Sequence, residues 1–245
     1  MVYIRKISGG ISLIELFLML LLAITVMGIA VYFIPVGGAP AALSTSAGIP
    51  TGAPMISIGL AVTGILSAVS VIGQSTIIML MYGAVASMIM IAIVMFFSNI
   101  IHVYGVGVPL ASSNIGKDPL TGFNQDEYVS PGTKGHGIPT ISFVSGIIGA
   151  LLAGIGGSLS FAVLFNQFLS MNQSVNSAGS LASIISLVIF CIMAVLSSYN
   201  IGGTIQGLYD KKFKTKIIPG LISSLIISLI LSISCIIIIW GLMNV

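Results

Sequence analysis

The sequence predicts an all-α integral membrane protein of about six transmembrane helices, and two observations support this fold class. Hydrophobic residues make up 57% of the 245 positions and charged residues only 5%, whereas a soluble domain carries about 25% charged residues. In addition, no Asp, Glu, Lys or Arg occurs between Glu15 and Lys117 or between Lys134 and Asp210. Such runs leave no water-facing surface of ordinary composition, so they exclude a soluble globular protein.

Apolar runs bounded by turn residues place the spans in one membrane domain covering residues 1–245. The predicted spans are residues 11–34, 55–72, 76–99, 140–165, 181–198 and 217–243. The first follows Arg5 and Lys6 as in a signal peptide, but its apolar run is too long and lacks a clear small-residue cleavage site. Residues 35–54 are uncharged and rich in Gly, Pro, Ala and Ser. They favour a re-entrant or cavity-lining segment as much as a surface loop, because irregular backbone at membrane depth needs protein or water beside it.

The fourth span, residues 140–165, is glycine-rich and organises the chain. Small residues recur at intervals of four along one face, namely Ser142, Gly146, Ala150, Gly154, Ser158 and Ala162, and a second stripe holds Gly149, Ala153 and Gly157. Stripes of this kind let helix backbones approach closely in lipid, so we expect helix packing at Gly146, Ala150, Gly154, Gly149 and Gly157. The alternative is that glycine is simply common in membrane helices.

The charged residues predict the orientation in the membrane. The loops 109–139 and 199–216 fall on one side if all six spans cross, and they hold ten of the thirteen charged residues. The positive-inside rule therefore places both loops in the cytoplasm. Arg5 and Lys6 break this rule. Because the net charge of +3 comes from loop residues, it indicates topology and not a nucleic-acid partner.

A sequence pattern that occurs twice suggests a parallel repeat of two-helix hairpins. The pattern Gly-x-Pro-x-Ile-Ser occurs at residues 52–57 and again at 137–142, each time at the start of a glycine-bearing span. Two spans per copy would make the copies face the same way across the membrane. Chance similarity between glycine-rich helices is the alternative.

No nucleophile, metal or phosphate constellation can be read from the sequence. His102 and His136 stand alone, and Cys191 and Cys235 lack CxxC spacing and are typical of packing residues in apolar spans. We therefore expect no catalytic residue and no bound cofactor in this chain.

Polar residues near the ends of spans are candidates to line an ion pathway or a cavity. They are Glu15, Asn99, His102, Tyr199, Asn200, Thr204 and Gln206. An ionisable group inside a span often marks an ion path because its burial is costly, but Glu15 lies only about one turn inside, where water can reach it. Residues 99–107 and 199–207 offer amide, hydroxyl and glycine-freed carbonyl oxygens that suit Na⁺. Helix capping by Asn and Gly is the alternative.

Seven unusual motifs follow one another along the chain. They are Pro35-Val-Gly-Gly-Ala-Pro-Ala-Ala42, Asp118-Pro-x-Thr-Gly122, Tyr128-Val-Ser-Pro-Gly-Thr133, Gly135-His-Gly-Ile-Pro-Thr140, Phe143-Val-Ser-Gly-Ile-Ile-Gly149, Ser198-Tyr-Asn-Ile-Gly-Gly-Thr-Ile205 and Asp210-x-Lys-Phe-Lys214. Together they resemble the D subunit of tetrahydromethanopterin S-methyltransferase from methanogenic archaea. The similarity covers nearly the full length and is weakest in the first dozen residues and the last span.

This resemblance implies a multi-subunit complex in the cell membrane that moves a methyl group from tetrahydromethanopterin to coenzyme M through a corrinoid and couples the transfer to Na⁺ export. It implies that the corrinoid and the methyltransferase site belong to partner subunits. It also implies that this multi-pass chain, surrounded by lipid, stands beside the C and E subunits and helps to form the Na⁺ pathway. Two other functions stay open: a self-sufficient secondary transporter, which the near absence of charge inside the spans disfavours, and a purely structural membrane anchor.

Overall fold

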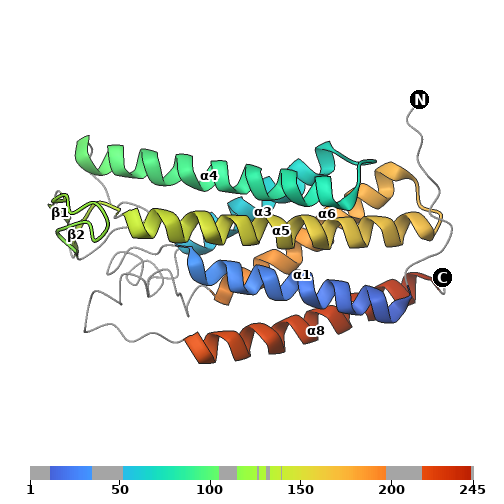
Figure 1. The fold of residues 1–245 in the computed structure, drawn as a ribbon. Helices are drawn as coiled ribbons and strands as arrows, with labels where there is room; N and C mark the ends of the chain where they lie inside the picture. The colour runs from blue at the N-terminus through green and yellow to red at the C-terminus, as the bar shows by residue number, and fades with distance from the viewer. Residues whose placement is uncertain are drawn as a thin grey trace.

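The computed structural model describes residues 12–34, 52–104, 115–125, 127–130, 133–138, 140–196 and 217–243. Its helices are α1 (Leu13–Phe33), α3 (Gly52–Ser70), α4 (Thr76–Tyr104), α5 (Thr140–Ser170), α6 (Val175–Ala194) and α8 (Ile217–Met243), and its strands are β1 (Glu127–Ser130) and β2 (Thr133–His136). The helices run alternately in opposite directions along one bundle (Figure 1). In the described part of the chain, five of them are long and apolar enough to cross a membrane, and α3 adds a shorter apolar stretch. The predicted all-α membrane fold of about six helices is thus confirmed.

Helix α5 lies at the centre of the bundle, and it contacts α1, α3, α4 and α6 (Figure 1). Of its most apolar window, 67% is buried, against 28% for α4 and for α8. Helix α8 is peripheral and packs mainly on α1. The glycine-rich helix α5 is therefore the one that α1, α3, α4 and α6 surround.

Helices α3 and α4 form one hairpin and α5 and α6 form another. Helix α3 crosses in the same direction as α5, and α4 in the same direction as α6 (Figure 1). The cross-contacts also correspond, because α4 packs on α5 while α6 packs on α3. This arrangement matches a parallel repeat of two-helix hairpins, with α1 and α8 added beside it.

Four helices extend beyond the spans that hydropathy predicts, and one of them, α3, begins at Gly52 and not at residue 55. Helix α4 continues to Tyr104, α5 continues to Ser170, and α6 begins at Val175 and not near residue 181. The predicted span ends lie where amide and hydroxyl side chains begin in the sequence. Such side chains are tolerated in a helix that continues beyond its apolar stretch. The predicted loop 166–180 is therefore wrong, since only residues 171–174 lie outside the two helices. The predicted irregular segment 35–54 lies largely outside the described residues.

Helix α5 ends in a well-defined C-terminal turn that leads into α6. Asn172 adopts the left-handed conformation at φ 60°, and its amide donates to the carbonyl oxygen of Leu169 at 3.1 Å while the amide of Gln173 donates to that of Phe168 at 3.2 Å. This is the hydrogen-bond pattern of a Schellman motif. Ser174 then caps α6 by accepting a hydrogen bond from the amide of Ser177.

The β1–β2 hairpin is an element that the hydropathy pattern does not predict. Its antiparallel strands pair Glu127 with His136 and Ser130 with Thr133. The hairpin lies beyond the start of α5, whereas the start of α1, the end of α8 and the turns after α3 and α5 lie at the opposite end of the bundle (Figure 1).

Candidate functional site

Gly154 of α5 and Gly83 of α4 bring two helix backbones into direct contact. A Cβ added to Gly154 would lie 2.3 Å from the carbonyl oxygen of Gly83 and 2.7 Å from the Cα of Ala84. A Cβ added to Gly83 would lie 2.9 Å from the carbonyl oxygen of Gly154. Only glycine fits on either side of this contact. The close approach supplies dispersion contact between helices that the hydrophobic effect does not drive together in lipid.

The remaining small residues of α5 face other helices of the same chain. A Cβ added to Gly149 would lie 3.0 Å from the carbonyl oxygen of Ala30, and one added to Gly156 would lie 2.9 Å from that of Ala23, both on α1. The helix-packing candidates are all buried: Gly146, Ala150, Gly154, Gly149 and Gly157. Their partners lie within this chain.

Hydroxyl groups also join the helices at further points in the described part of the chain. Ser87 of α4 donates to the carbonyl oxygen of Leu60 on α3 at 2.9 Å, and Ser145 of α5 donates to that of Phe33 on α1 at 2.7 Å. The Tyr32 hydroxyl of α1 donates to the carbonyl oxygen of Gly220 on α8. Such bonds hold helices together where lipid offers no other partner.

Glu15 has a role at the end of a helix. Its side chain accepts hydrogen bonds from the Ser12 amide at 3.0 Å and from the Ser12 hydroxyl at 2.9 Å. In return its own amide donates to the Ser12 hydroxyl at 3.2 Å, which completes a capping box. The carboxylate is exposed, and its part in an ion path stays a prediction.

The other candidate pathway residues are not brought together by described geometry. Asn99 and His102 lie on the last turns of α4, which reaches Tyr104, and their side chains are outside the description. Tyr199, Asn200, Thr204 and Gln206 lie outside the described residues. The expected lining of a cavity by Asn99 and Asn200 therefore stays a prediction.

The carboxylate of Asp118 accepts four hydrogen bonds that join its loop to the start of α5. Asp118 was not among the candidate site residues chosen from the sequence. Its carboxylate accepts hydrogen bonds from the Thr140 amide at 3.0 Å and the Thr140 hydroxyl at 2.8 Å. It also accepts from the Thr121 amide at 2.9 Å and from the Thr121 hydroxyl. Thr140 is the first residue of α5, so Asp118 caps this central helix from 22 residues upstream.

The electrostatics of Asp118 follow from these donors. Burial alone raises the pKa of the carboxyl, but the hydrogen bonds from Thr121 and Thr140 outweigh it and lower the pKa to about 2. Asp118 is only 4% exposed, while Leu120 and Phe123 in the same loop are 60% and 74% exposed. The loop thus holds two large apolar side chains in an outward position.

The backbone of this loop is also closely bonded. The Asp118 amide donates to the carbonyl oxygen of Phe123 at 2.8 Å, and the Gln125 amide donates to that of Gly116 at 2.9 Å. The ring Nδ1 of His136 on β2 lies 3.2 Å from the carbonyl oxygen of Gln125. Loop, hairpin and the start of α5 therefore form one connected unit.

Some buried oxygens have no hydrogen-bond partner in the described part of the chain. They are Gln167 Oε1 and the hydroxyl oxygens of Ser186, Ser224, Ser228 and Ser232. The three on α8 recur every four residues, and Ser224 packs so closely on α1 that a Cβ added to Gly28 would lie 2.1 Å from its hydroxyl oxygen. All five are uncharged oxygens, and Ser224 lies in a close contact of small residues between α8 and α1. The described residues hold no group of three His, Cys, Asp or Glu side chains suited to a metal ion.

Comparison with known proteins gives one consistent result. The family model for the D subunit of tetrahydromethanopterin S-methyltransferase matches residues 13–228. The chain is 48% identical over 201 residues to the protein of that name from Methanothermobacter thermautotrophicus, covering 80% of this chain and 86% of that one. It is 42% identical over 202 residues to the counterpart from Methanopyrus kandleri, covering 82% and 87%. The counterpart from Methanocaldococcus jannaschii is 45% identical over 195 residues, covering 77% and 81%.

Proposed function

Because the chain belongs to the family of the tetrahydromethanopterin S-methyltransferase D subunit, we propose that it is a non-catalytic membrane component of the complex that transfers a methyl group from methyl-tetrahydromethanopterin to coenzyme M. The transfer is coupled to Na⁺ translocation across the cell membrane, and this chain helps to form the Na⁺ pathway. The observation that carries the proposal is the family match over residues 13–228, which coincides with a bundle of apolar helices.

A role without catalysis agrees with the side chains that the bundle offers. Its described interior holds hydroxyl, amide and backbone oxygens, and its partnered carboxylates Glu15 and Asp118 lie at helix ends. A dehydrated cation in hydrocarbon needs several oxygen ligands and a compensating charge. Partner subunits therefore supply the charge, the corrinoid and the methyltransferase site, and this chain contributes neutral oxygens.

The partners in this proposal are the membrane-embedded C and E subunits and the corrinoid-bearing subunit, with membrane lipid around them. The end of the bundle that carries the β1–β2 hairpin faces the cytoplasm, because the sequence places Lys117, Lys134 and the lysines of 211–216 in loops of that side. The loop held by Asp118 gives this side a fixed surface for soluble partners.

The pathway part of the proposal is tested with Asn99→Leu and Asn200→Leu combined in the assembled complex. In proteoliposomes we expect weaker Na⁺ dependence of methyl transfer and less Na⁺ uptake, with corrinoid methylation intact. Asn176→Leu is the control, since Asn176 is exposed in the first turn of α6, at the opposite end. An unchanged Na⁺ response in a correctly assembled double variant would leave this chain as a scaffold.

The proposal is separated from a self-sufficient transporter by purification in mild detergent. We expect the chain to co-purify with corrinoid-bearing partners, and we expect the isolated chain to move no Na⁺ in proteoliposomes. Na⁺ uptake by the isolated chain would favour the transporter instead.

A further inference from the structure

Helix α8 carries a row of three serine hydroxyls into its contact with α1, and we propose that this serine row binds a file of water molecules inside the apolar layer. Ser224, Ser228 and Ser232 are 1%, 0% and 0% exposed. None of their hydroxyl oxygens has a hydrogen-bond partner in the described part of the chain. The inference rests on these side chains and does not depend on the proposed Na⁺ pathway.

Two contacts fix the register between the serine row and α1. A Cβ added to Gly28 of α1 would lie 2.1 Å from the hydroxyl oxygen of Ser224, so this hydroxyl is turned toward α1. One turn earlier on α8, the carbonyl oxygen of Gly220 accepts a hydrogen bond from the Tyr32 hydroxyl. The two helices run in opposite directions (Figure 1). Each further turn of α8 therefore meets the preceding turn of α1.

This register leaves the other two hydroxyls facing apolar side chains. It places Ser228 beside Ile24 and Ser232 beside Leu20, and both aliphatic residues are fully buried. Neither side chain can donate or accept a hydrogen bond. A buried hydroxyl without a partner costs free energy, so α1 cannot supply what these hydroxyls need.

Serine hydroxyls elsewhere in the helices bond to their own backbone. Ser234 on the other side of α8 donates to the carbonyl oxygen of Ile230 at 2.8 Å, and Ser183 of α6 donates to that of Gly179 at 2.7 Å. This bond to the preceding turn is usual for serine within a helix. The serine row does not make it, and its hydroxyls are free for a ligand between the helices.

The spacing of the serine row suits single water molecules. Residues four positions apart on a helix are separated by about 6 Å along its axis. Two O–H···O hydrogen bonds in sequence span about 5.6 Å. One water molecule can therefore bridge each pair of neighbouring hydroxyls, and carbonyl oxygens of α8 can accept from it through their second lone pair. Buried water with two to four polar partners is a normal part of protein structure.

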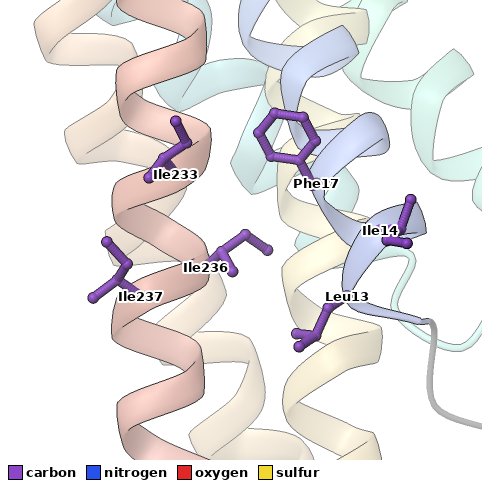
Figure 2. Close-up of a pocket in the computed structure, with 6 residues that line it drawn as sticks. All are labelled: Leu13, Ile14, Phe17, Ile233, Ile236 and Ile237. Carbon is purple, nitrogen blue, oxygen red and sulfur yellow. The ribbon is translucent and has the colours of Figure 1, made fainter.

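The two ends of the serine row differ in polarity. Beyond Ser232 a groove opens between α1 and α8, into which Phe17 and Ile236 project (Figure 2). No polar side chain is among its lining residues, which are Leu13, Ile14, Phe17, Ile233, Ile236 and Ile237. In the other direction the row continues to the bond between Tyr32 and Gly220. Water therefore enters from the start of α8, and a small outward movement admits it because this peripheral helix packs mainly on α1.

The test is the reaction of cysteines with methyl methanethiosulfonate, a small uncharged reagent that attacks only the thiolate. Cys191→Ser and Cys235→Ala remove the native thiols, and Ser228→Cys is then compared with Ser234→Cys in the assembled complex in lipid vesicles. Ser234 is exposed and lies nearer to an end of α8 than Ser228 does, so depth alone predicts faster reaction at Ser234. We expect the Ser228→Cys variant to react about tenfold faster, because a thiol in apolar surroundings does not ionise readily.

Equal or slower reaction of the Ser228→Cys variant would overturn the proposal, because it would show that the serine row is dry. Ser232→Cys is compared in the same way if the Ser228→Cys variant does not assemble. A second measurement is the Tm of the purified chain in detergent. We expect Ser228→Ala to lower it, since the bridging waters lose a partner, and Ser234→Ala to leave it nearly unchanged. An unchanged or higher Tm for Ser228→Ala would also overturn the proposal.

Discussion

Gly154→Ala should destabilise this protein strongly although it adds only one methyl group. The new Cβ would lie 2.3 Å from the carbonyl oxygen of Gly83, 2.6 Å from its carbonyl carbon and 2.7 Å from the Cα of Ala84. All three atoms belong to the backbone of α4, so no side chain can rotate away. Helices α4 and α5 must separate, and overpacking of this kind costs about 1–3 kcal/mol.

Gly157→Ala provides a control on the same helix. Its Cβ would meet only Ile65 Cγ1 at 3.6 Å and the carbonyl oxygen of Ala61 at 3.8 Å, which are ordinary contacts. Replacement of a helical glycine by alanine gains up to about 1 kcal/mol. The two alanine variants should therefore shift the stability in opposite directions.

Thermal unfolding of the purified chain in mild detergent measures the difference. Reaction of a thiol-specific dye with the buried Cys235 reports the unfolding; Cys191 is exposed and is first replaced by serine in all variants. We expect a lower Tm for Gly154→Ala and an equal or higher Tm for Gly157→Ala. If both variants unfold at the temperature of the parent, the backbone contact between Gly154 and Gly83 does not hold the bundle together, and the reasoning fails.

The remaining predictions concern polar and charged groups. Asp118→Asn should increase hydrogen exchange at the Thr140 amide, because loss of the charged acceptor weakens this hydrogen bond by about 1–3 kcal/mol; unchanged exchange would contradict the capping role. The folded pKa of Asp118 is lowered to about 2 from 3.8, so its stabilisation is complete above pH 3.8 and is lost as the pH falls toward 2, and the protection of the Thr140 amide in the parent, taken relative to the intrinsic exchange rate at each pH, should fall over that window. Tyr32→Phe should cost about 1 kcal/mol in detergent unfolding through the lost bond to Gly220, whereas an unaltered Tm would show that this bond is not stabilising. A cysteine at Lys117 should resist impermeant thiol reagents in intact cells, and rapid labelling there would invert the orientation.

The helices could be predicted because each depends on its own residues. Apolar length alone identifies the spans, and small residues at intervals of four identify the face of α5 that packs. The helix ends were harder to place, because Asn172 and Ser174 act through backbone conformation and capping, which a hydropathy scan does not register. The β1–β2 hairpin had a partial signal, since the turn dipeptide Pro131-Gly132 follows the strand formers Tyr128 and Val129, whereas Lys134 and Gly135 of the second strand do not favour a strand.

Asp118 could not be selected in the same way. Its motif Asp118-Pro-x-Thr-Gly122 indicates a turn, and the bond to Thr121 lies within that turn. The bond to Thr140 joins residues 22 positions apart and depends on how the chain returns from the hairpin to α5. No local pattern contains that information.

The packing of α5 changes how an assembly experiment with this protein should be interpreted. The sequence indicates that the small face of α5 touches helices, and a substitution such as Gly154→Leu therefore suggests itself as a test of contact between subunits. In the structure that face is occupied by α4 of the same chain at Gly83. Gly154→Leu should unfold the isolated chain, so a loss of partner subunits in this variant would not identify an interface.

Partner helices instead have the exposed sides of α4 and α8 available, where Val85 and Ile230 are 52% and 57% exposed. Substitutions on those sides should release partners while the isolated chain keeps its Tm, and a parallel loss of Tm would show that they too act within the chain.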